Sequence, residues 1–239
     1  MIITVLNGTD SRYGAPRHLS TITELDSTLF MTPPPLPAEG KRDANRQARR
    51  RSIVEVARAV FLRDGFAGTT MSAVAAALGG SKETLWRHFT TKEDLFAAVV
   101  EAETAGYSTE MIGLLDGSHG LVTTLEAFCR RFIEIVTSPD VIALHRLIVG
   151  ETGRFPELGR IFFARGPGMV EQRLIRFMAI HMDSGTLRAG DPAEAAQMLI
   201  SLCLGGSHQR LLWSGDAVVG DQGVEAGRAL ALFLRAFAA

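Results

Sequence analysis

The chain has 239 residues, 46% of them hydrophobic and 21% charged, which is enough apolar material for a substantial core. Its 25 lysines and arginines nearly balance 26 acidic residues, so the net charge of −1 excludes a protein that is basic throughout. Two cysteines exclude a disulfide framework, and no apolar stretch approaches the roughly 20 residues that a membrane-spanning helix needs, so we expect a cytoplasmic protein without a membrane partner.

Residues 1–42 are predicted to be a disordered extension. They are rich in Gly, Pro, Ser and Thr, and they include a proline-rich run from Met31 to Pro37. Proline lacks the amide hydrogen that a helix needs, so this composition disfavours regular structure. A related hypothesis is that Met31 is the true start of the protein.

The segment from Lys41 to Asp64 is predicted to form a basic helix. Eight basic residues against three acidic ones give it a net charge of +5, whereas the rest of the chain sums to −6. A basic patch on a slightly acidic protein is typical of a surface that binds phosphate groups. A solvated helix face or a flexible basic tail is the alternative interpretation.

Two short helices joined by a tight turn are predicted at residues 70–88. Thr70 and Ser81 are good N-caps, and Gly79 with Gly80 can take the backbone angles that end the first helix. This helix-turn-helix pattern is how many proteins present a small helix to the major groove of DNA. A helical hairpin that binds nothing is the alternative.

The second of these helices has one apolar edge. Leu85 and Phe89 are expected to face inward, which leaves the other side chains of the helix for outside contacts. Thr90 or Thr91 is expected to cap a further helix that runs to about Leu115.

Residues 45–100 resemble the DNA-binding domain of the TetR family of bacterial transcriptional regulators. The pattern Gly-x-Ser-Lys-x-Thr-Leu-aromatic-x-His-Phe-x-x-Lys-x-x-Leu, from Gly79 to Leu95, carries most of the resemblance. The other matching residues are Ile53, Ala57, Phe61, Gly65, Phe66, Thr69, Thr70, Val74, Ala75 and Phe96. The chain departs from the family pattern at Gly80, where an apolar residue such as Val is usual, and at Trp86, where Tyr is usual.

The resemblance implies a DNA-binding domain over residues 43–92 that contacts a double-stranded DNA operator. Contacts to phosphates position such a protein, and contacts to base edges specify the sequence. The residues expected to contact phosphates are Thr70, Ser81, Trp86, His88 and Lys92. The residues expected to reach base edges are Lys82, Glu83, Thr84 and Arg87. The residues expected to reach the minor groove or flanking phosphates are Arg46, Arg49 and Arg50.

The fold class predicted for the whole chain is all-α, with an N-terminal three-helix helix-turn-helix domain followed by a C-terminal helical ligand-binding and dimerisation bundle at 93–239. An apolar stripe from Leu121 to Ile135 predicts one helix of this bundle. The other helices are expected to start at Pro139, Pro156, Pro167, Asp191 and Asp221, with ends near Asp183, Trp213 and Phe237.

The second half resembles the AefR-like C-terminal domain found within the TetR family. The resemblance rests on residues 147–151 and 154–158, on Gly166-Pro167 and Gly185-x-Leu187, and on Asp191-Pro192-x-x-Ala195-Ala196. It implies a homodimer in which helices 191–213 and 221–238 form a four-helix interface with their mates.

The apolar residues expected on these two helices are Met198, Leu199, Leu202, Leu211, Leu212, Trp213, Leu230, Phe233, Leu234 and Phe237. Gly205 and Gly206 would permit close helix approach. The alternative is that both apolar faces pack within one subunit only.

The same resemblance implies a site for a small-molecule effector, of unknown identity, between the helices of the second half. The residues expected to line it are Phe128, Phe132, His145, Phe162, Phe163, Met169, Arg173 and Phe177. The competing interpretation is that each of them is an ordinary core residue.

Catalytic residues, metal sites and cofactors are not expected. The histidines are dispersed, without His-x-x-x-His or Cys-x-x-Cys spacing. Cys129 and Cys203 are expected to be small core residues in a reducing compartment.

The sequence therefore predicts a homodimeric transcriptional repressor, not an enzyme, that a small-molecule effector releases from its operator. Two alternatives are a regulator of the same fold that needs no effector or acts as an activator, and a helical small-molecule-binding protein that does not bind DNA.

Overall fold

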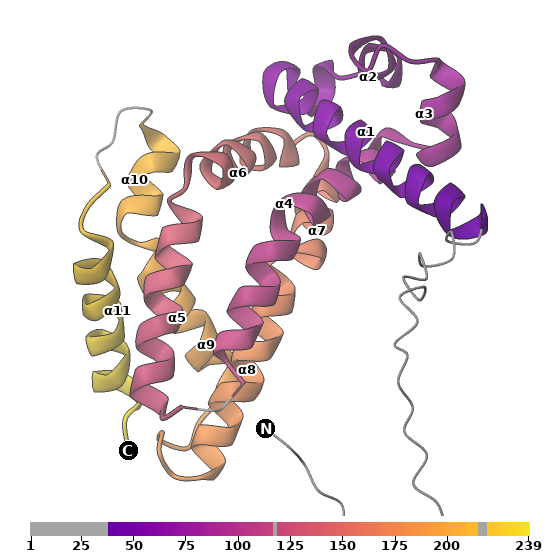
Figure 1. The fold of residues 1–239 in the computed structure, drawn as a ribbon. Helices are drawn as coiled ribbons and strands as arrows, with labels where there is room; N and C mark the ends of the chain where they lie inside the picture. The colour runs from indigo at the N-terminus through magenta and orange to yellow at the C-terminus, as the bar shows by residue number, and fades with distance from the viewer. Residues whose placement is uncertain (1–37, 117–118, 215–218) are drawn as a thin grey trace, which may run out of the picture. The chain divides into compact units, whose positions relative to one another are not determined.

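The computed structural model describes residues 38–116, 119–214 and 219–239, and these are helical with short connections (Figure 1). No strand occurs in these ranges, where the only β contact is an isolated bridge between Leu187 and Ala238. Most of the predicted extension, including Met31, lies outside the described residues. Its last residues, 38–42, are helical rather than disordered, because the basic helix begins at Ala38.

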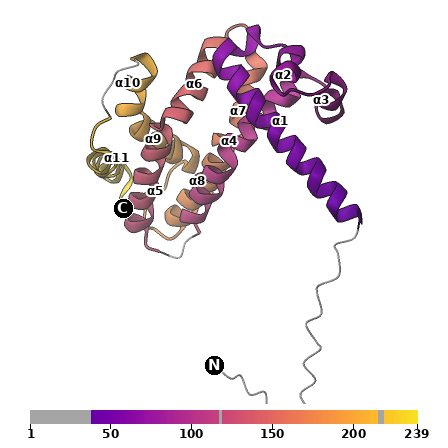
Figure 2. The ribbon, with the colours of Figure 1, turned by 45° about the horizontal axis from the view of Figure 1, so that its top comes forward.

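The helix-turn-helix consists of α1 (Ala38–Gly68), α2 (Met71–Ala77) and α3 (Lys82–His88), which lie together in both views (Figures 1 and 2). Helix α1 is kinked near its end at Gly65, where φ is +73°. A side chain other than glycine is strained at such an angle. The kink starts the turn that leads into α2.

Helix α4 (Lys92–Leu114) belongs to two apolar cores. Its first half packs with α1–α3 around Phe61, Phe66 and Phe96, whose ring centroids lie 5.3–5.8 Å apart. Its second half packs into the other core through Met111. The predicted domain boundary between residues 92 and 93 therefore falls at the start of a helix that both cores share.

The second core is built from α4, α5, α8, α9 and α11. The helices that follow α4 are α5 (Leu121–Val136), α6 (Pro139–Thr152), α7 (Pro156–Arg165), α8 (Pro167–Asp183), α9 (Pro192–Leu204), α10 (Ser207–Trp213) and α11 (Gln222–Phe237). Helix α11 packs on α5 and α9, and α8 packs on α9. The predicted helix starts are confirmed, because proline occupies the first position of α6, α7, α8 and α9.

The single helix predicted over 191–213 is wrong, because the chain breaks it into α9 and α10 at Gly205 and Gly206. A β-carbon on Gly206 would lie 2.6 Å from a carboxylate oxygen of Glu225, so glycine is needed there. The Glu225 carboxylate accepts hydrogen bonds from the Ser207 amide at 3.1 Å and the Ser207 hydroxyl at 2.5 Å. Gly206 thus admits a carboxylate of α11 within the same chain.

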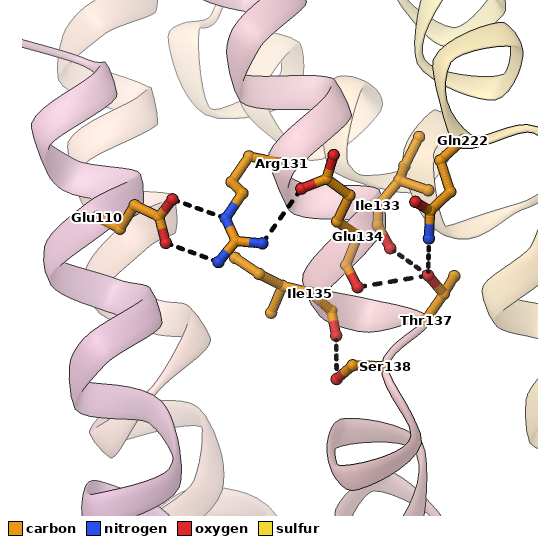
Figure 3. A network of polar contacts seen from close by, with 8 residues as sticks. All are labelled: Glu110, Arg131, Ile133, Glu134, Ile135, Thr137, Ser138 and Gln222. Carbon is orange, nitrogen blue, oxygen red and sulfur yellow. Dashed lines mark hydrogen bonds and ion pairs between the residues drawn. The ribbon is translucent and has the colours of Figure 1, made fainter.

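Polar contacts join the bundle helices outside the second core (Figure 3). Arg131 of α5 forms two hydrogen bonds of 2.7 and 2.8 Å with the Glu110 carboxylate of α4. At the end of α5, the buried Thr137 hydroxyl accepts a 2.9 Å hydrogen bond from the Gln222 side chain at the start of α11. Such bidentate and buried contacts fix the spacing of α4, α5 and α11.

Among the described helices, none has both the length and the apolar content needed to cross a bilayer.

Candidate nucleic-acid interface

The turn of the helix-turn-helix is fixed by two side-chain caps. The Thr70 hydroxyl accepts a 3.1 Å hydrogen bond from the Ala73 amide, and the Ser81 hydroxyl accepts one of 3.2 Å from the Thr84 amide. Gly79 ends α2 with a φ of +64°. These contacts confirm the predicted caps and explain why such short helices are stable here, since isolated helices of this length are not.

Helix α3 buries one edge and exposes the rest. Leu85 is fully buried and Phe89, its C-cap, is 3% exposed, as the spacing predicted. The exposed residues of α3 and its cap are Ser81, Lys82, Glu83, Trp86 and Arg87, and Thr84 and His88 are half-buried. Every residue predicted to reach a base edge therefore keeps some accessible surface.

Three arginines of α1 lie on the face of that helix that packs against α3. Ile53 and Ala57 are fully buried in the first core, and Arg46, Arg49 and Arg50 continue the same i, i+3, i+4 stripe toward the start of α1. The Arg50 guanidinium confirms this orientation, since it lies 4.7 Å from the centroid of the Phe89 ring. The basic helix and α3 therefore present one combined surface.

The charge of this surface acts on His88. Partial burial lowers the pKa of His88, and neighbouring positive charges lower it further. Those charges belong to Arg46, Arg50, Arg87 and Arg49. The imidazole is therefore neutral at pH 7, and the positive charge around it comes from the guanidinium groups.

Most of these cations have no partner within the part of the chain that the structure describes. Among the described residues, no group forms a hydrogen bond or ion pair with Arg46, Arg49, Arg50 or Lys82. Arg87 has only an exposed pair with Glu83 at 3.3 Å. Exposed pairs of this kind contribute little to stability, so these cations are available to an external polyanion.

Lys92, one of the residues predicted to contact a phosphate, has internal partners in the structure. Its ammonium donates to the Phe66 carbonyl at 2.7 Å and to the Thr69 carbonyl at 3.1 Å, and it lies 4.2 Å from the centroid of the Phe66 ring. Phe155 lies on another side of it, at 5.8 Å. Lys92 therefore binds the end of α1 to the start of α4, and its contact with a phosphate stays a prediction.

The residues predicted to line an effector site do not form one set. Phe128, Phe132 and Phe177 lie together in or against the second core, where the rings of Phe128 and Phe132 stack at 5.8 Å. Phe163 and Met169 are 53% and 51% exposed, so they do not join the second core, and their place in an effector site stays a prediction. Their positions on α7 and α8 turn them toward solvent.

His145 and Phe162 form a separate contact between α6 and α7, with ring centroids 5.1 Å apart. His145 Nδ1 lies 2.9 Å from His208 Nε2, within hydrogen-bond distance. His145 therefore has a protein partner, as an ordinary core histidine does. No local spacing indicates this pair, because 63 residues separate its members.

Arg173, the last of the predicted effector-site residues, lies in a stripe of side chains on α8. Arg173, Phe177 and His181 follow one another at intervals of four residues, and Phe177 lies 4.5 Å from the His181 ring. Arg173 Nε and His181 Nδ1 are buried, and no described protein group pairs with either. Buried nitrogens without a partner are uncommon and point to a polar ligand or water. His181 was not among the predicted residues.

Within the described residues, no group of three or more His, Cys, Asp or Glu side chains is placed to hold a metal ion. Cys129 and Cys203 are free and buried, as expected of small core residues, and a hydrogen bond with the Cys129 side chain, together with burial, raises the pKa of Cys203.

Two family descriptions match the chain. "Bacterial regulatory proteins, tetR family" matches residues 53–99, and "AefR-like transcriptional repressor, C-terminal domain" matches residues 123–239. The first match contains the helix-turn-helix, and the second contains the bundle from α5 onward.

Individual proteins resemble the chain over most of its length. The curated HTH-type transcriptional repressor AcnR of Corynebacterium glutamicum is 25% identical over 162 residues, which cover 68% of this chain and 81% of AcnR. The solved structure of the flavonoid-responsive regulator FrrA is 31% identical, with a TM-score of 0.70, covering 80% of this chain and 98% of FrrA. A TetR-family regulator from Mesorhizobium loti is 25% identical with a TM-score of 0.71, covering 81% of this chain and 98% of its own.

Proposed function

Because the chain belongs to the TetR family of bacterial regulatory proteins, we propose that it acts as a homodimeric repressor which a small-molecule effector releases from its operator. Family membership makes it a DNA-binding transcriptional regulator of the repressor type. The observation that carries the proposal is the row of unpaired cations on α1 beside the exposed face of α3. The phosphates of duplex DNA are the regular row of anions that such a surface fits.

Helix α3 is the element that enters the major groove. Its exposed residues Lys82, Glu83 and Arg87 are long enough to reach base edges, and Arg87 can leave its loose pair with Glu83 to bind guanine. The Thr84 hydroxyl lies 3.0 Å from the Ser81 hydroxyl, which leaves the Thr84 methyl group for contact with a thymine methyl. These residues determine which operator sequence the protein recognises.

The phosphate contacts come from residues that surround α3. Arg46, Arg49 and Arg50 reach the DNA from α1, while Thr70 and Trp86, which are exposed, donate from the ends of the helix-turn-helix. Trp86 is 49% exposed, and its indole N–H can donate to a phosphate as a tyrosine hydroxyl would. Ser81 and His88 complete the set.

Dimerisation uses the outer face of α9, α10 and α11. Leu199, Leu230 and Phe233 are committed to the second core, so they are unable to meet a partner. The apolar side chains left outside are Met198, Trp213, Val224 and Leu232, which are 43%, 83%, 58% and 42% exposed. An open groove of about 500 Å³ between α9 and α11, lined by Leu202, Val224 and Leu232 among others, suits a helix of a second copy.

The effector site lies on the interior stripe of α8. Phe177 supplies apolar surface, and the unpaired nitrogens of Arg173 and His181 supply polar contacts that orient a ligand. FrrA responds to flavonoids, and this supports a ligand that combines aromatic rings with hydroxyl groups. Phe177 is 3% exposed in the second core, so the bundle would have to open beside it before such a ligand could pack on the ring and hydrogen-bond to the two nitrogens.

Helix α6 is the element that couples the two halves, because it contacts α1 at both of its ends. At its start, Asp140 accepts a 2.6 Å hydrogen bond from Arg58 of α1. At its end, the Glu151 carboxylate accepts one of 3.0 Å from the Ala67 amide, just after the kink of α1. A movement of α6 therefore shifts the helix-turn-helix.

The middle of α6 contacts α10. His145 lies against His208, and the Arg146 guanidinium donates to the carbonyls of Leu211 and Leu212 at the end of α10. An effector that favours one arrangement of the bundle therefore changes the spacing of the two recognition helices in the dimer. DNA is released because the two arrangements differ in affinity for the operator.

An electrophoretic mobility shift with the DNA upstream of the chain's own gene tests the proposal. We expect a retarded complex that an unrelated duplex of the same length displaces only at large excess. Flavonoids are the first probe for the effector. A compound that raises the melting temperature and weakens the retarded complex supports release by an effector. No retardation at low salt would overturn the function, and a bound compound that leaves the complex intact would overturn effector release.

A further inference from the structure

We propose that the missing side chain at Gly80 makes Arg49 a DNA-binding residue, because only glycine at this position lets the Arg49 guanidinium lie over the turn that precedes the recognition helix. This inference rests on the proposed DNA-binding function and adds a residue pair to it.

The contact is defined by a short distance. A β-carbon built on Gly80 would lie 2.7 Å from Arg49 Nη2, which is closer than carbon and nitrogen atoms approach without bonding. The other neighbour, the Leu78 side chain, lies at an ordinary 3.7 Å. Any residue larger than glycine would therefore move the guanidinium and little else.

The backbone does not require glycine at this position. The glycines with positive φ are Gly65, Gly79 and Gly185, and Gly80 is not among them. Alanine at position 80 is therefore compatible with the backbone of the turn, and the guanidinium that it displaces is the flexible end of a long side chain. The requirement for glycine at position 80 thus comes from the neighbouring arginine.

Two arginines of α1 flank the two ends of α3. Arg49 lies over Gly80, one residue before the N-cap Ser81, while Arg50 lies over the ring of Phe89, the C-cap. Arg49 is half-buried by its contact with the turn, whereas the residues on either side of it in α1 are exposed. The two guanidinium groups therefore bracket the helix that enters the groove.

The chemistry of Arg49 points to a phosphate. Its guanidinium is partly removed from water, yet no described residue supplies it with a carboxylate or carbonyl. A guanidinium offers donors in a planar fork that binds two oxygens of a phosphate at once. Since α3 reads the base edges, Arg49 at its entrance binds the phosphate at the edge of the major groove, a contact independent of base sequence.

A double-mutant cycle tests the pair. The Kd for an operator duplex is measured by fluorescence anisotropy for the full chain, for Gly80→Ala, for Arg49→Ala and for the double variant. We expect each single variant to weaken binding about tenfold, as loss of a charge-assisted contact in each half-site would. The double variant should bind no more weakly than Arg49→Ala alone.

A matched glycine replacement separates this effect from general stiffening of the backbone. Gly113 on α4 has no atom within 4 Å of a built β-carbon, so Gly113→Ala should leave the Kd unchanged.

Because the proposed contact is with a phosphate, Gly80→Ala and Arg49→Ala should each weaken binding to operator and to unrelated duplexes by the same factor.

Two results would overturn the inference: an unchanged Kd for Gly80→Ala, or losses at Gly80 and Arg49 that multiply in the double variant. Gly80→Ser, whose side chain also displaces the guanidinium, repeats the measurement if Gly80→Ala melts at a lower temperature. Failure of the unaltered chain to bind any duplex would instead refute the proposed function itself.

Discussion

The ammonium of Lys92 donates a 2.7 Å hydrogen bond to the Phe66 carbonyl and lies 4.2 Å from the centroid of the Phe66 ring. The same nitrogen donates to the Thr69 carbonyl at 3.1 Å. One side chain thus satisfies two carbonyls at the end of α1 and places a cation over an aromatic face. Its position at the start of α4 connects the helix-turn-helix to the shared helix.

Replacing Lys92 by Met should lower the free energy of unfolding by about 2 kcal/mol, because two charge-assisted hydrogen bonds and the cation–π contact are lost. Urea denaturation measures the change. Lys82→Met is the matched control, since Lys82 is exposed and unpaired among the described residues, and its stability should not change. Equal stabilities of the two variants would contradict the role assigned to Lys92.

Replacing Gly65 by Ala should destabilise the chain by about 2 kcal/mol or more, because the backbone angle is unfavourable for alanine and its β-carbon would lie 2.7 Å from the Glu151 carboxylate. Thermal unfolding provides the measurement. Gly150→Ala in α6 meets no atom within 4 Å and should be neutral or stabilising. If Gly65→Ala had the same melting temperature as Gly150→Ala, the kink would tolerate a side chain and the prediction would be contradicted.

The stability of the chain should fall between pH 7 and pH 5 through His145. Burial, and then the charge of His208, lower the pKa of His145 to about 4. The unfolded state, with a pKa near 6.5, therefore binds the proton first, and His145 alone removes about 2 kcal/mol by pH 5. Urea denaturation at both pH values should show a smaller fall for His145→Gln. The same fall in that variant would assign the pH dependence to other groups.

Thr84→Ala and Arg46→Ala should affect DNA binding in different ways. The loss of the Thr84 methyl group should change the preference among operator variants at one base pair, whereas the loss of Arg46 should weaken all duplexes by a common factor. Titration of a set of single-base operator variants with both proteins distinguishes the two effects. Uniform losses for both variants would contradict the division between base and phosphate contacts.

Leu232→Glu should abolish the dimer, because it places a charge on the exposed apolar face of α11. Size-exclusion chromatography with light scattering measures the mass. Val122→Glu is the control, since Val122 is 51% exposed on α5, a helix that the proposed interface does not include. A dimeric Leu232→Glu variant would place the interface elsewhere.

Local features of the fold were predictable from the sequence. Thr70, Ser81 and Asp191 each cap a helix within three residues of themselves, and such signals act over a few residues. Gly205 and Gly206 are an equally local signal, but two adjacent glycines are compatible both with close helix packing, as predicted, and with the helix break that the structure shows. The all-helical fold followed from these signals and from the apolar stripes.

Contacts between distant residues were not predictable. Lys92 and Phe66 are 26 residues apart, and His145 and His208 are 63 apart. Their pairing depends on how helices pack, which no local spacing encodes. The predicted effector-site residues are spread over several places in the structure for the same reason, since an apolar helix does not show which of its aromatic rings, Phe162 or Phe163 for instance, will face solvent.

The salt dependence of operator affinity tests most directly whether the arginine stripe and α3 form a DNA-binding surface. Plots of log K against log salt concentration should be linear and steep, and alanine at Arg46, Arg49 and Arg50 together should make the slope less steep by about 5 for a dimer. An affinity that does not change with salt, or a slope that the three replacements leave unaltered, would contradict the account.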